Sequence, residues 1–202
     1  MIAIIDYGMG NVGSIVNMIK KAGGESKLIK NSGELIDFDA IILPGVGSFD
    51  IGMDRLEKLG FIEPIKNLVL NKKIPILGIC LGMQLMTLSS EEGARKGLGL
   101  IEAETVKFKS SDGFKVPHMG WNYVTSKKES RLTINFKENY KYYFVHSYFV
   151  KCKNDNDILL TTNYQNEFCS AFQKHNIIGV QFHPEKSHNY GLELFKNFLE
   201  MQ

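Results

Sequence analysis

The chain has 202 residues, of which 44% are hydrophobic, and its 24 basic and 22 acidic residues leave a formal net charge of +2. This length and apolar content suit one α/β domain, and the near-neutral balance gives no reason to expect nucleic acid or an anionic membrane surface as a partner. The three cysteines are too few for a disulfide framework or a zinc site, which is typical of a protein of the reducing cytoplasm.

Strand-like runs alternate with helical segments in the first half of the chain. Four of these runs are expected to form strands: residues 2–5, 26–29, 40–43 and 76–79. Helices are expected between them, over residues 12–22 and 61–70. This alternation predicts a mostly parallel central sheet that is flanked by helices.

Strand-like runs follow one another closely in the second half of the chain. They are residues 142–150, 158–163, 168–173 and 177–182. They predict antiparallel additions to the same sheet, so residues 1–202 are expected to fold as one domain. An amphipathic helix over residues 190–201 is expected to end the chain.

The segment around Cys80 carries the clearest chemical signal. A predicted strand ends just before Cys80, a helix is expected to start at Gly82, and Gly78 and Gly82 stand two residues to either side of the cysteine. A nucleophile on such a sharp turn presents its side chain outward, and the helix N-terminus favours the thiolate over the thiol. A lone cysteine in an apolar run is usually structural, but this framing predicts that Cys80 is a nucleophile.

A base for this thiolate is expected near the end of the chain. The predicted strand 177–182 leads directly into His183-Pro184-Glu185. Residues i and i+2 of an extended segment lie on the same side, so Glu185 can hold one ring nitrogen of His183 while the other faces a substrate. Pro184 stiffens the link between them. The sequence therefore predicts a catalytic triad of Cys80, His183 and Glu185.

A site for the negative charge of a tetrahedral intermediate is also needed. The predicted strand 40–43 ends in Pro44-Gly45-Val46-Gly47, where glycines let backbone amides approach a ligand closely. The amide of Leu81, which follows the nucleophile, and that of Val46 or Gly47 are expected to form this oxyanion hole.

Together these motifs resemble those of the class I glutamine amidotransferases, in which a Cys-His-Glu triad releases ammonia from glutamine. The resemblance is collinear over essentially the whole chain, and it is closest to the branch that serves histidine biosynthesis. Besides residues 78–84, it rests on residues 6–11, 43–47, 97–100, 117–122, 143–148 and 181–187.

The resemblance implies roles for residues around the substrate, L-glutamine. Gln84 is expected to line the glutamine pocket, and Glu92 is expected to recognise the amino acid end of the substrate. The backbone around Ser147 and Tyr148 is expected to hold the rest of the molecule.

The resemblance also implies a protein partner. Asn11 and Lys186 match positions at the face shared with a HisF-type cyclase, a βα-barrel subunit, so a heterodimer is expected. Ammonia would reach that subunit through a protected tunnel, because ammonia released into water would be protonated and lost as a nucleophile. The resemblance implies no cofactor and no metal.

Two alternatives stay open from the sequence. Residues 8–13 satisfy the pattern G-x-G-x-x-G after the first strand, which suits a non-catalytic dinucleotide-binding module, although Lys30 and Asn31 stand where a ribose-binding acid is expected. The other alternative is a paralogous glutaminase that supplies ammonia for the modification of a surface sugar. The catalytic motifs do not separate that glutaminase from a subunit of the histidine pathway.

Overall fold

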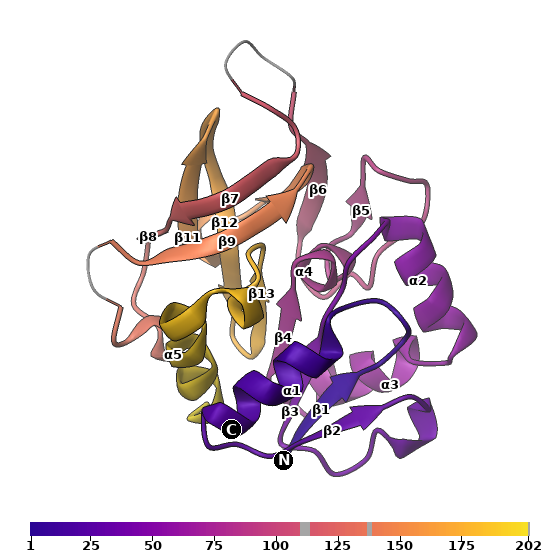
Figure 1. Cartoon of the computed structure of the whole chain (residues 1–202). Helices are drawn as coiled ribbons and strands as arrows, with labels where there is room; N and C mark the ends of the chain where they lie inside the picture. The colour runs from indigo at the N-terminus through magenta and orange to yellow at the C-terminus, as the bar shows by residue number, and fades with distance from the viewer. Residues whose placement is uncertain (110–113, 137–138, 202) are drawn as a thin grey trace.

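The computed structural model describes residues 1–109, 114–136 and 139–201 of the chain. In this part a sheet of eleven strands forms the centre of the molecule, with the order β2-β1-β3-β4-β13-β12-β10-β6-β5 along its main path (Figure 1). The first five of these strands run parallel to one another: β2 (Ser26–Ile29), β1 (Ile2–Ile5), β3 (Ala40–Leu43), β4 (Ile76–Ile79) and β13 (Ile177–Val180).

The other half of the sheet is mainly antiparallel. Its strands are β12 (Asn166–Lys174), β10 (Tyr148–Cys152), β6 (Ala103–Lys107), β11 (Ile158–Tyr164) and β8 (Thr125–Ser126), with β5 (Ser89–Ser90) parallel to β6 at the edge. A separate antiparallel pair, β7 (His118–Tyr123) and β9 (Lys141–His146), lies in front of β11 and β12 in Figure 1.

Helices cover both faces of the parallel half, because the buried strands direct alternate apolar side chains to either side. Helices α1 (Val12–Lys21) and α5 (His188–Leu199) pack on one face with Ile2 and Ile4. The other face carries α2 (Phe49–Lys58), α3 (Ile62–Lys66) with the π-helical turn that follows it (Asn67–Asn71), and α4 (Leu81–Leu85). The predicted fold class is therefore confirmed.

Two predicted strands of the second half differ from the structure. The run 142–150 is broken at Ser147 into β9 and β10, which belong to different sheets. The run 177–182 ends at Val180 and pairs in parallel with β4 as well as antiparallel with β12, so it belongs to the centre of the sheet. Its burial on both faces explains why it is apolar throughout. Within the described residues, no helix is both long and apolar enough to cross a membrane.

Candidate active site

The predicted sharp turn is present at Cys80, between β4 and α4. Cys80 has a φ of 53°, a backbone conformation that costs free energy for a residue with a side chain. A Cβ on Gly82 would lie 1.8 Å from the carbonyl oxygen of Leu43, and one on Gly78 would lie 2.4 Å from Sδ of Met86. Both glycines are therefore needed by close packing. Cys80 is only 7% exposed, less than the sequence predicts.

Replacing Gly82 by alanine is expected to lower the free energy of unfolding by more than about 3 kcal/mol, because backbone atoms on β3 must move. Gly13 is a matched control, since a Cβ there meets nothing within 4 Å and the residue lies in α1. Gly13→Ala is expected to stabilise the chain by about 0.5–1 kcal/mol. Urea unfolding of both variants measures the difference. Equal free energies of unfolding for the two variants would contradict the prediction, because they would show that the backbone of β3 accommodates the added Cβ without loss of stability.

His183 and Glu185 meet at the end of β13. Nδ1 of His183 donates to Oε1 of Glu185 over 2.8 Å, and both side chains are 2% exposed. The residues after His183 form a single 3₁₀ turn, η5 (Pro184–Lys186), where the sequence predicts extended backbone. Ser187 holds this turn, because its hydroxyl donates to the carbonyl oxygen of His183 over 2.6 Å. The predicted contact is present, through a different local geometry.

Cys80 and His183 come together because β4 and β13 are neighbours. The amide of Cys80 donates to the carbonyl oxygen of Val180 over 2.8 Å. Nε2 of His183 is buried, and no group among the described residues meets it in hydrogen-bonding geometry. Burial alone would lower the pKa of His183, but its interactions with Cys80 and Glu185 raise it to about 10. This raised pKa favours the imidazolium form of His183.

Two buried glutamines connect the cysteine to β10. Nε2 of Gln181 lies 3.7 Å from Sγ of Cys80, and Oε1 of Gln181 accepts from Nε2 of Gln84 over 3.1 Å. The same Nε2 of Gln84 donates to the carbonyl oxygen of Tyr148, also over 3.1 Å. Gln84 and Tyr148, both predicted to contact substrate, are therefore neighbours. Sequence reasoning missed the contact of Gln181 with Cys80, because it joins segments 101 residues apart.

The glycine segment that follows β3 lies against the turn at Cys80. A Cβ on Gly45 would lie 2.7 Å from the hydroxyl of Tyr7 and 2.8 Å from both Cβ of Leu81 and the amide of Gly82. The predicted oxyanion residues are therefore close to one another. Val46 is 44% exposed and Gly47 is also exposed, so these two residues beyond Gly45 are open to solvent.

Tyr7 is a residue of this region that sequence reasoning missed. Its hydroxyl donates to the carbonyl oxygen of Pro44 over 2.7 Å, which anchors the start of the glycine segment. Burial and then the charge of Cys80 raise the pKa of Tyr7, against a lowering by Arg55, so the phenol stays a neutral donor. No motif marks this contact, because it joins two segments 37 residues apart.

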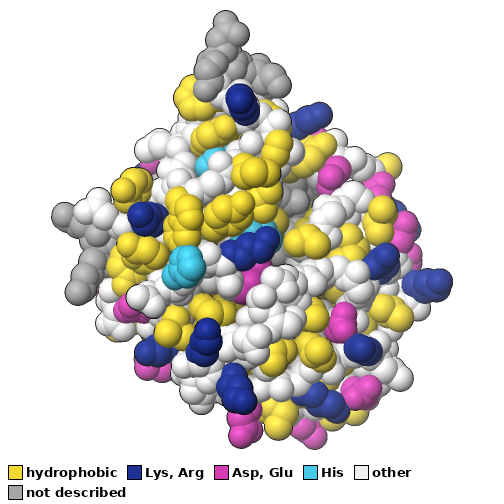
Figure 2. Space-filling view, in the orientation of Figure 1, with side chains coloured by type: hydrophobic (Ala, Val, Ile, Leu, Met, Phe, Trp, Pro, Cys, Tyr) yellow, Lys and Arg dark blue, Asp and Glu magenta, His cyan; other side chains and the backbone are white. Residues whose placement is uncertain are grey.

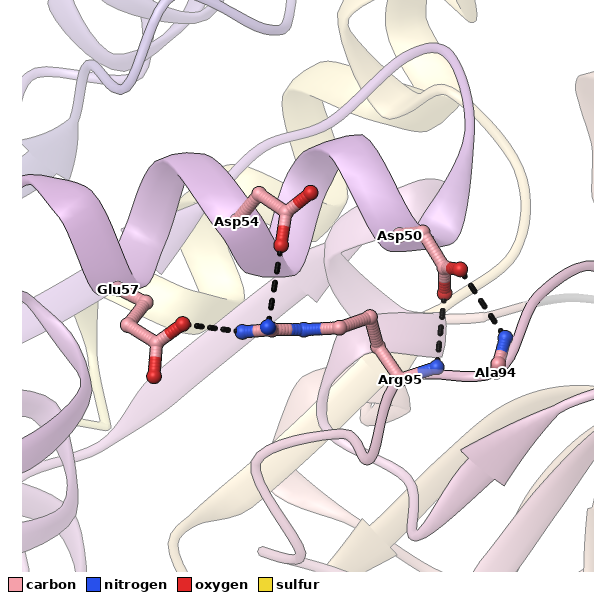
Figure 3. Close-up of polar contacts among 5 residues, drawn as sticks. All are labelled: Asp50, Asp54, Glu57, Ala94 and Arg95. Carbon is pink, nitrogen blue, oxygen red and sulfur yellow. Dashed lines mark hydrogen bonds and ion pairs between the residues drawn. The ribbon is translucent and has the colours of Figure 1, made fainter.

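Glu92 caps the helix that follows the glycine segment. Its Oε2 accepts from the amide of Phe49, the first residue of α2, over 2.7 Å. The loop beyond Glu92 is tied to the same helix, as Figure 3 shows: Asp50 accepts from the amides of Ala94 and Arg95, each over 3.0 Å. The Arg95 side chain pairs in turn with Asp54 and Glu57. One oxygen of Glu92 thus has a structural partner, and the other is left for the predicted substrate contact.

The carbonyl groups of the segment predicted to hold glutamine already have partners within the chain. The carbonyl oxygen of Ser147 accepts from the amide of Phe108 over 3.0 Å. That of Tyr148 accepts from Gln84 and from Nδ1 of His146. Any contact of this backbone with glutamine must therefore use its remaining groups.

A hydrophobic surface lies on β7. Met119, Trp121 and Tyr123 project outward from β7 and are exposed. We call these three residues the β7 face; Figure 2 shows hydrophobic side chains gathered over β7 and β9, with lysine and histidine among them. Asn11 and Lys186, which are predicted to meet a partner, are also exposed. Asn11 directly precedes α1 and Lys186 lies in η5, and these two elements contact each other.

The glycine-rich segment 8–13 is explained by packing. Nη1 of Arg55 donates to the carbonyl oxygen of Gly8 over 2.5 Å, and a Cβ on Gly8 would lie 2.7 Å from that nitrogen. A Cβ on Gly10 would lie 3.0 Å from Cβ of Pro44. The side chain of Arg55 thus fills the space that a dinucleotide phosphate would need, so the structure gives this alternative no support.

The other two cysteines lie on β10 and β12, next to each other. Their sulfur atoms, of Cys152 and Cys169, are 3.9 Å apart and not bonded. In the described ranges, no three histidine, cysteine or acidic side chains are placed to hold a metal ion.

Comparisons with known proteins agree with this geometry. The family model described as glutamine amidotransferase class-I matches residues 3–201. The imidazole glycerol phosphate synthase subunit HisH 2 of Methanococcus maripaludis is 59% identical over 201 residues, with 99% of each chain covered. The subunit of the same name from Pseudomonas aeruginosa is 45% identical, with 100% of each chain covered. The solved structure of PurLQS from Thermotoga maritima shares the fold, with a TM-score of 0.78 at 18% identity and coverage of 99% of this chain and 97% of that one.

Proposed function

The chain belongs to the class I glutamine amidotransferases, and we propose that it is the glutaminase subunit of an imidazole glycerol phosphate synthase, acting in histidine biosynthesis. The single observation that carries the chemistry is the meeting of Cys80, His183 and Glu185 at the ends of β4 and β13. The full-length identity of 59% to a HisH subunit supports the pathway.

The proposed reaction begins with attack of the Cys80 thiolate on the carboxamide carbon of L-glutamine. The amides of Leu81 and of Val46 or Gly47 stabilise the negative charge that develops on the oxygen. When the carbon–nitrogen bond breaks, the His183 imidazolium gives its proton to the departing nitrogen, and ammonia and a thioester result. Neutral His183 then takes a proton from water as the water attacks the thioester, which releases glutamate and the thiolate.

The released ammonia is proposed to pass to a partner subunit, a HisF-type cyclase with a βα-barrel. The β7 face supports a heterodimer, because exposed apolar patches mark interaction sites, and Asn11 and Lys186 are exposed as well. Within the described ranges, the contacts reported above are all assigned to glutamine hydrolysis or to packing, and an ammonia acceptor is proposed to bind to the partner. We place the complex in the cytoplasm, as the three free thiols suggest.

The experiment that tests the pathway follows the amide nitrogen. Glutamine labelled with ¹⁵N in its amide is given to this chain with a HisF-type cyclase from the same source and that cyclase's substrate. The label is expected in imidazole glycerol phosphate, with little loss to free ammonium in the medium. If glutamine is hydrolysed but this cyclase neither stimulates the chain nor receives the label, the ammonia serves another acceptor, such as a surface-sugar synthase.

Glu185→Gln is expected to lower kcat for glutamine hydrolysis by about 10³–10⁴-fold, because an amide no longer holds His183 in the productive tautomer. The KM for glutamine is expected to change little, since Glu185 does not reach the substrate. Steady-state glutamate production with the cyclase present measures both constants. Glu25→Gln is a matched control in an exposed turn before β2, at the opposite end of the parallel strands. Near-normal turnover of Glu185→Gln would show that this carboxylate has only a structural role.

A further inference from the structure

A line of side-chain hydrogen bonds joins β7 to the backbone of Tyr148. Nδ2 of Asn122 lies 3.2 Å from Nε2 of His118, and Nδ1 of His118 lies 2.9 Å from Nε2 of His146. Nδ1 of His146 lies 2.7 Å from the carbonyl oxygen of Tyr148. His118 and His146 stand directly opposite each other in the pairing of β7 with β9. The triad uses neither histidine.

Valence fixes the position of every proton in this line. The carbonyl oxygen of Tyr148 can only accept, so Nδ1 of His146 carries a proton. If His146 is neutral, its Nε2 accepts, and Nδ1 of His118 must donate to it. Nε2 of His118 then accepts from Asn122. The amide of Asn122 is oriented independently, because its Oδ1 accepts from the amide of Tyr123 and its Nδ2 also donates to the carbonyl oxygen of Asn163.

The surroundings keep both imidazoles neutral. Both side chains are buried, and His118 stacks between Tyr164 and Phe144 at ring distances of 4.0 and 4.8 Å. Burial lowers the pKa of His118 to about 4. Burial also lowers the pKa of His146 to about 3. The hydrogen bond to Tyr148 acts in the opposite direction, and the charges of His118 and His183 lower the pKa by smaller amounts. A proton on either ring would place two donors face to face.

The line ends where the active-site contacts begin. The carbonyl oxygen of Tyr148 accepts from His146 on one side and from Gln84 on the other. Gln84 continues through Gln181 to the sulfur of Cys80. A shift of His146 would therefore move the backbone of Tyr148 and, through Gln84 and Gln181, loosen the side-chain contact with the sulfur of Cys80.

We propose that Asn122, His118 and His146 are positioning residues for glutamine, which act through two neutral Nδ1–H imidazoles on the carbonyl of Tyr148. This rests on the proposed glutaminase function. Asn122 and His118, where the line begins, lie on the inward side of β7, and the outward residues of this strand form the β7 face. The line thus connects the surface proposed to meet the cyclase with the backbone proposed to hold the substrate.

Nuclear magnetic resonance tests the line without any assay of activity. Long-range ¹H–¹⁵N correlations of the full chain, with ¹⁵N in its histidines, report which ring nitrogen carries the proton. His118 and His146 are both expected as neutral Nδ1–H tautomers that do not titrate between about pH 5.5 and 8, where an ordinary histidine with a pKa of about 6.5 does. An Nε2–H tautomer at either residue, or titration in that range, would overturn the proposal.

Steady-state kinetics with the cyclase present tests the positioning role. His146→Leu removes the donor to Tyr148 and is expected to raise the KM for glutamine about tenfold, with a smaller change in kcat. His146→Asn keeps a donor near the position of Nδ1 and is expected to restore KM to within about threefold of the unaltered chain. His175→Asn, in an exposed turn, is the control for loss of a histidine.

An unchanged KM in folded His146→Leu, or an equal defect in both variants of His146, would overturn the positioning role. If His146→Leu does not fold, Asn122→Ala decides, because Asn122 is only half-buried. Its KM is expected to rise about threefold, and an unchanged KM would overturn the proposal. If the unaltered chain hydrolyses no glutamine with its cyclase, the proposed function fails, while the tautomers still report on the line itself.

Discussion

Cys80→Ala is expected to abolish glutamine hydrolysis, with a fall in kcat of about 10⁴-fold or more, while the chain remains folded. Without the sulfur no thioester can form, and the remaining groups of a triad supply only a small part of its rate. Folding is expected to survive, because alanine removes only one buried atom from a residue that packs between β4 and α4. Glutamate production and circular dichroism measure the two effects.

Cys152→Ala and Cys169→Ala are the matched controls for this substitution. Their sulfur atoms contact each other on β10 and β12, and neither is hydrogen-bonded to Cys80 or His183. Each control is expected to keep kcat within about threefold of the unaltered chain, as surface and core substitutions remote from a site usually do. A loss in folded Cys169→Ala equal to that in Cys80→Ala would contradict the assignment of the nucleophile.

The second large effect is expected from the partner. The chain alone is predicted to be a poor glutaminase, and the cyclase with its substrate bound is predicted to raise kcat by about 10²–10³-fold, the usual value of one oxyanion-hole donor. The physical reason lies in Val46, which is exposed between Gly45 and Gly47. Glycines on both sides let its peptide rotate, so the resting chain is expected to hold this amide turned away from the substrate. Docking then shifts the population towards the competent conformation.

The control for this experiment is the cyclase without its substrate, which is expected to stimulate less than the loaded cyclase. Glutamate production by the purified chain, by the chain with empty cyclase and by the chain with loaded cyclase gives the three rates. Full turnover by the isolated chain, independent of the cyclase and its substrate, would contradict an incomplete oxyanion hole and favour a free-standing hydrolase.

The parallel half of the fold could be predicted because its signals are local. The strands 2–5, 40–43 and 76–79 are short apolar runs, and 26–29 is a strand-like run that ends in two apolar residues. The structure has all four strands with the predicted bounds. Helix α2 could also have been predicted, because its buried residues follow the helical spacing i, i+3, i+4 and i+7.

The second half could not be predicted fully, because strand partners are set by tertiary contacts. Residues 142–150 form one strand-like run in the sequence, yet Ser147 separates a strand that pairs with β7 from one that pairs with β6. The parallel pairing of β13 with β4 likewise depends on a strand a hundred residues earlier in the chain.

The candidate site shows the same division. Cys80, His183 and Glu185 could be found because each lies in a local motif at the end of a strand. Tyr7 and Gln181 could not, because their contacts with Pro44 and Cys80 join distant segments. The pairing of His118 with His146 depends on the register of β7 with β9, which no pattern in the sequence specifies.

The most direct test of the account is covalent trapping of the nucleophile. The chain, with loaded cyclase, is treated with a glutamine analogue that carries an electrophilic carbon in place of the carboxamide, and the modified peptides are identified by mass spectrometry. The account predicts a single adduct, on the sulfur of Cys80, whose formation glutamine slows and the cyclase accelerates. An adduct on Cys152 or Cys169 instead, or an unmodified Cys80 in a chain that still hydrolyses glutamine, would contradict it.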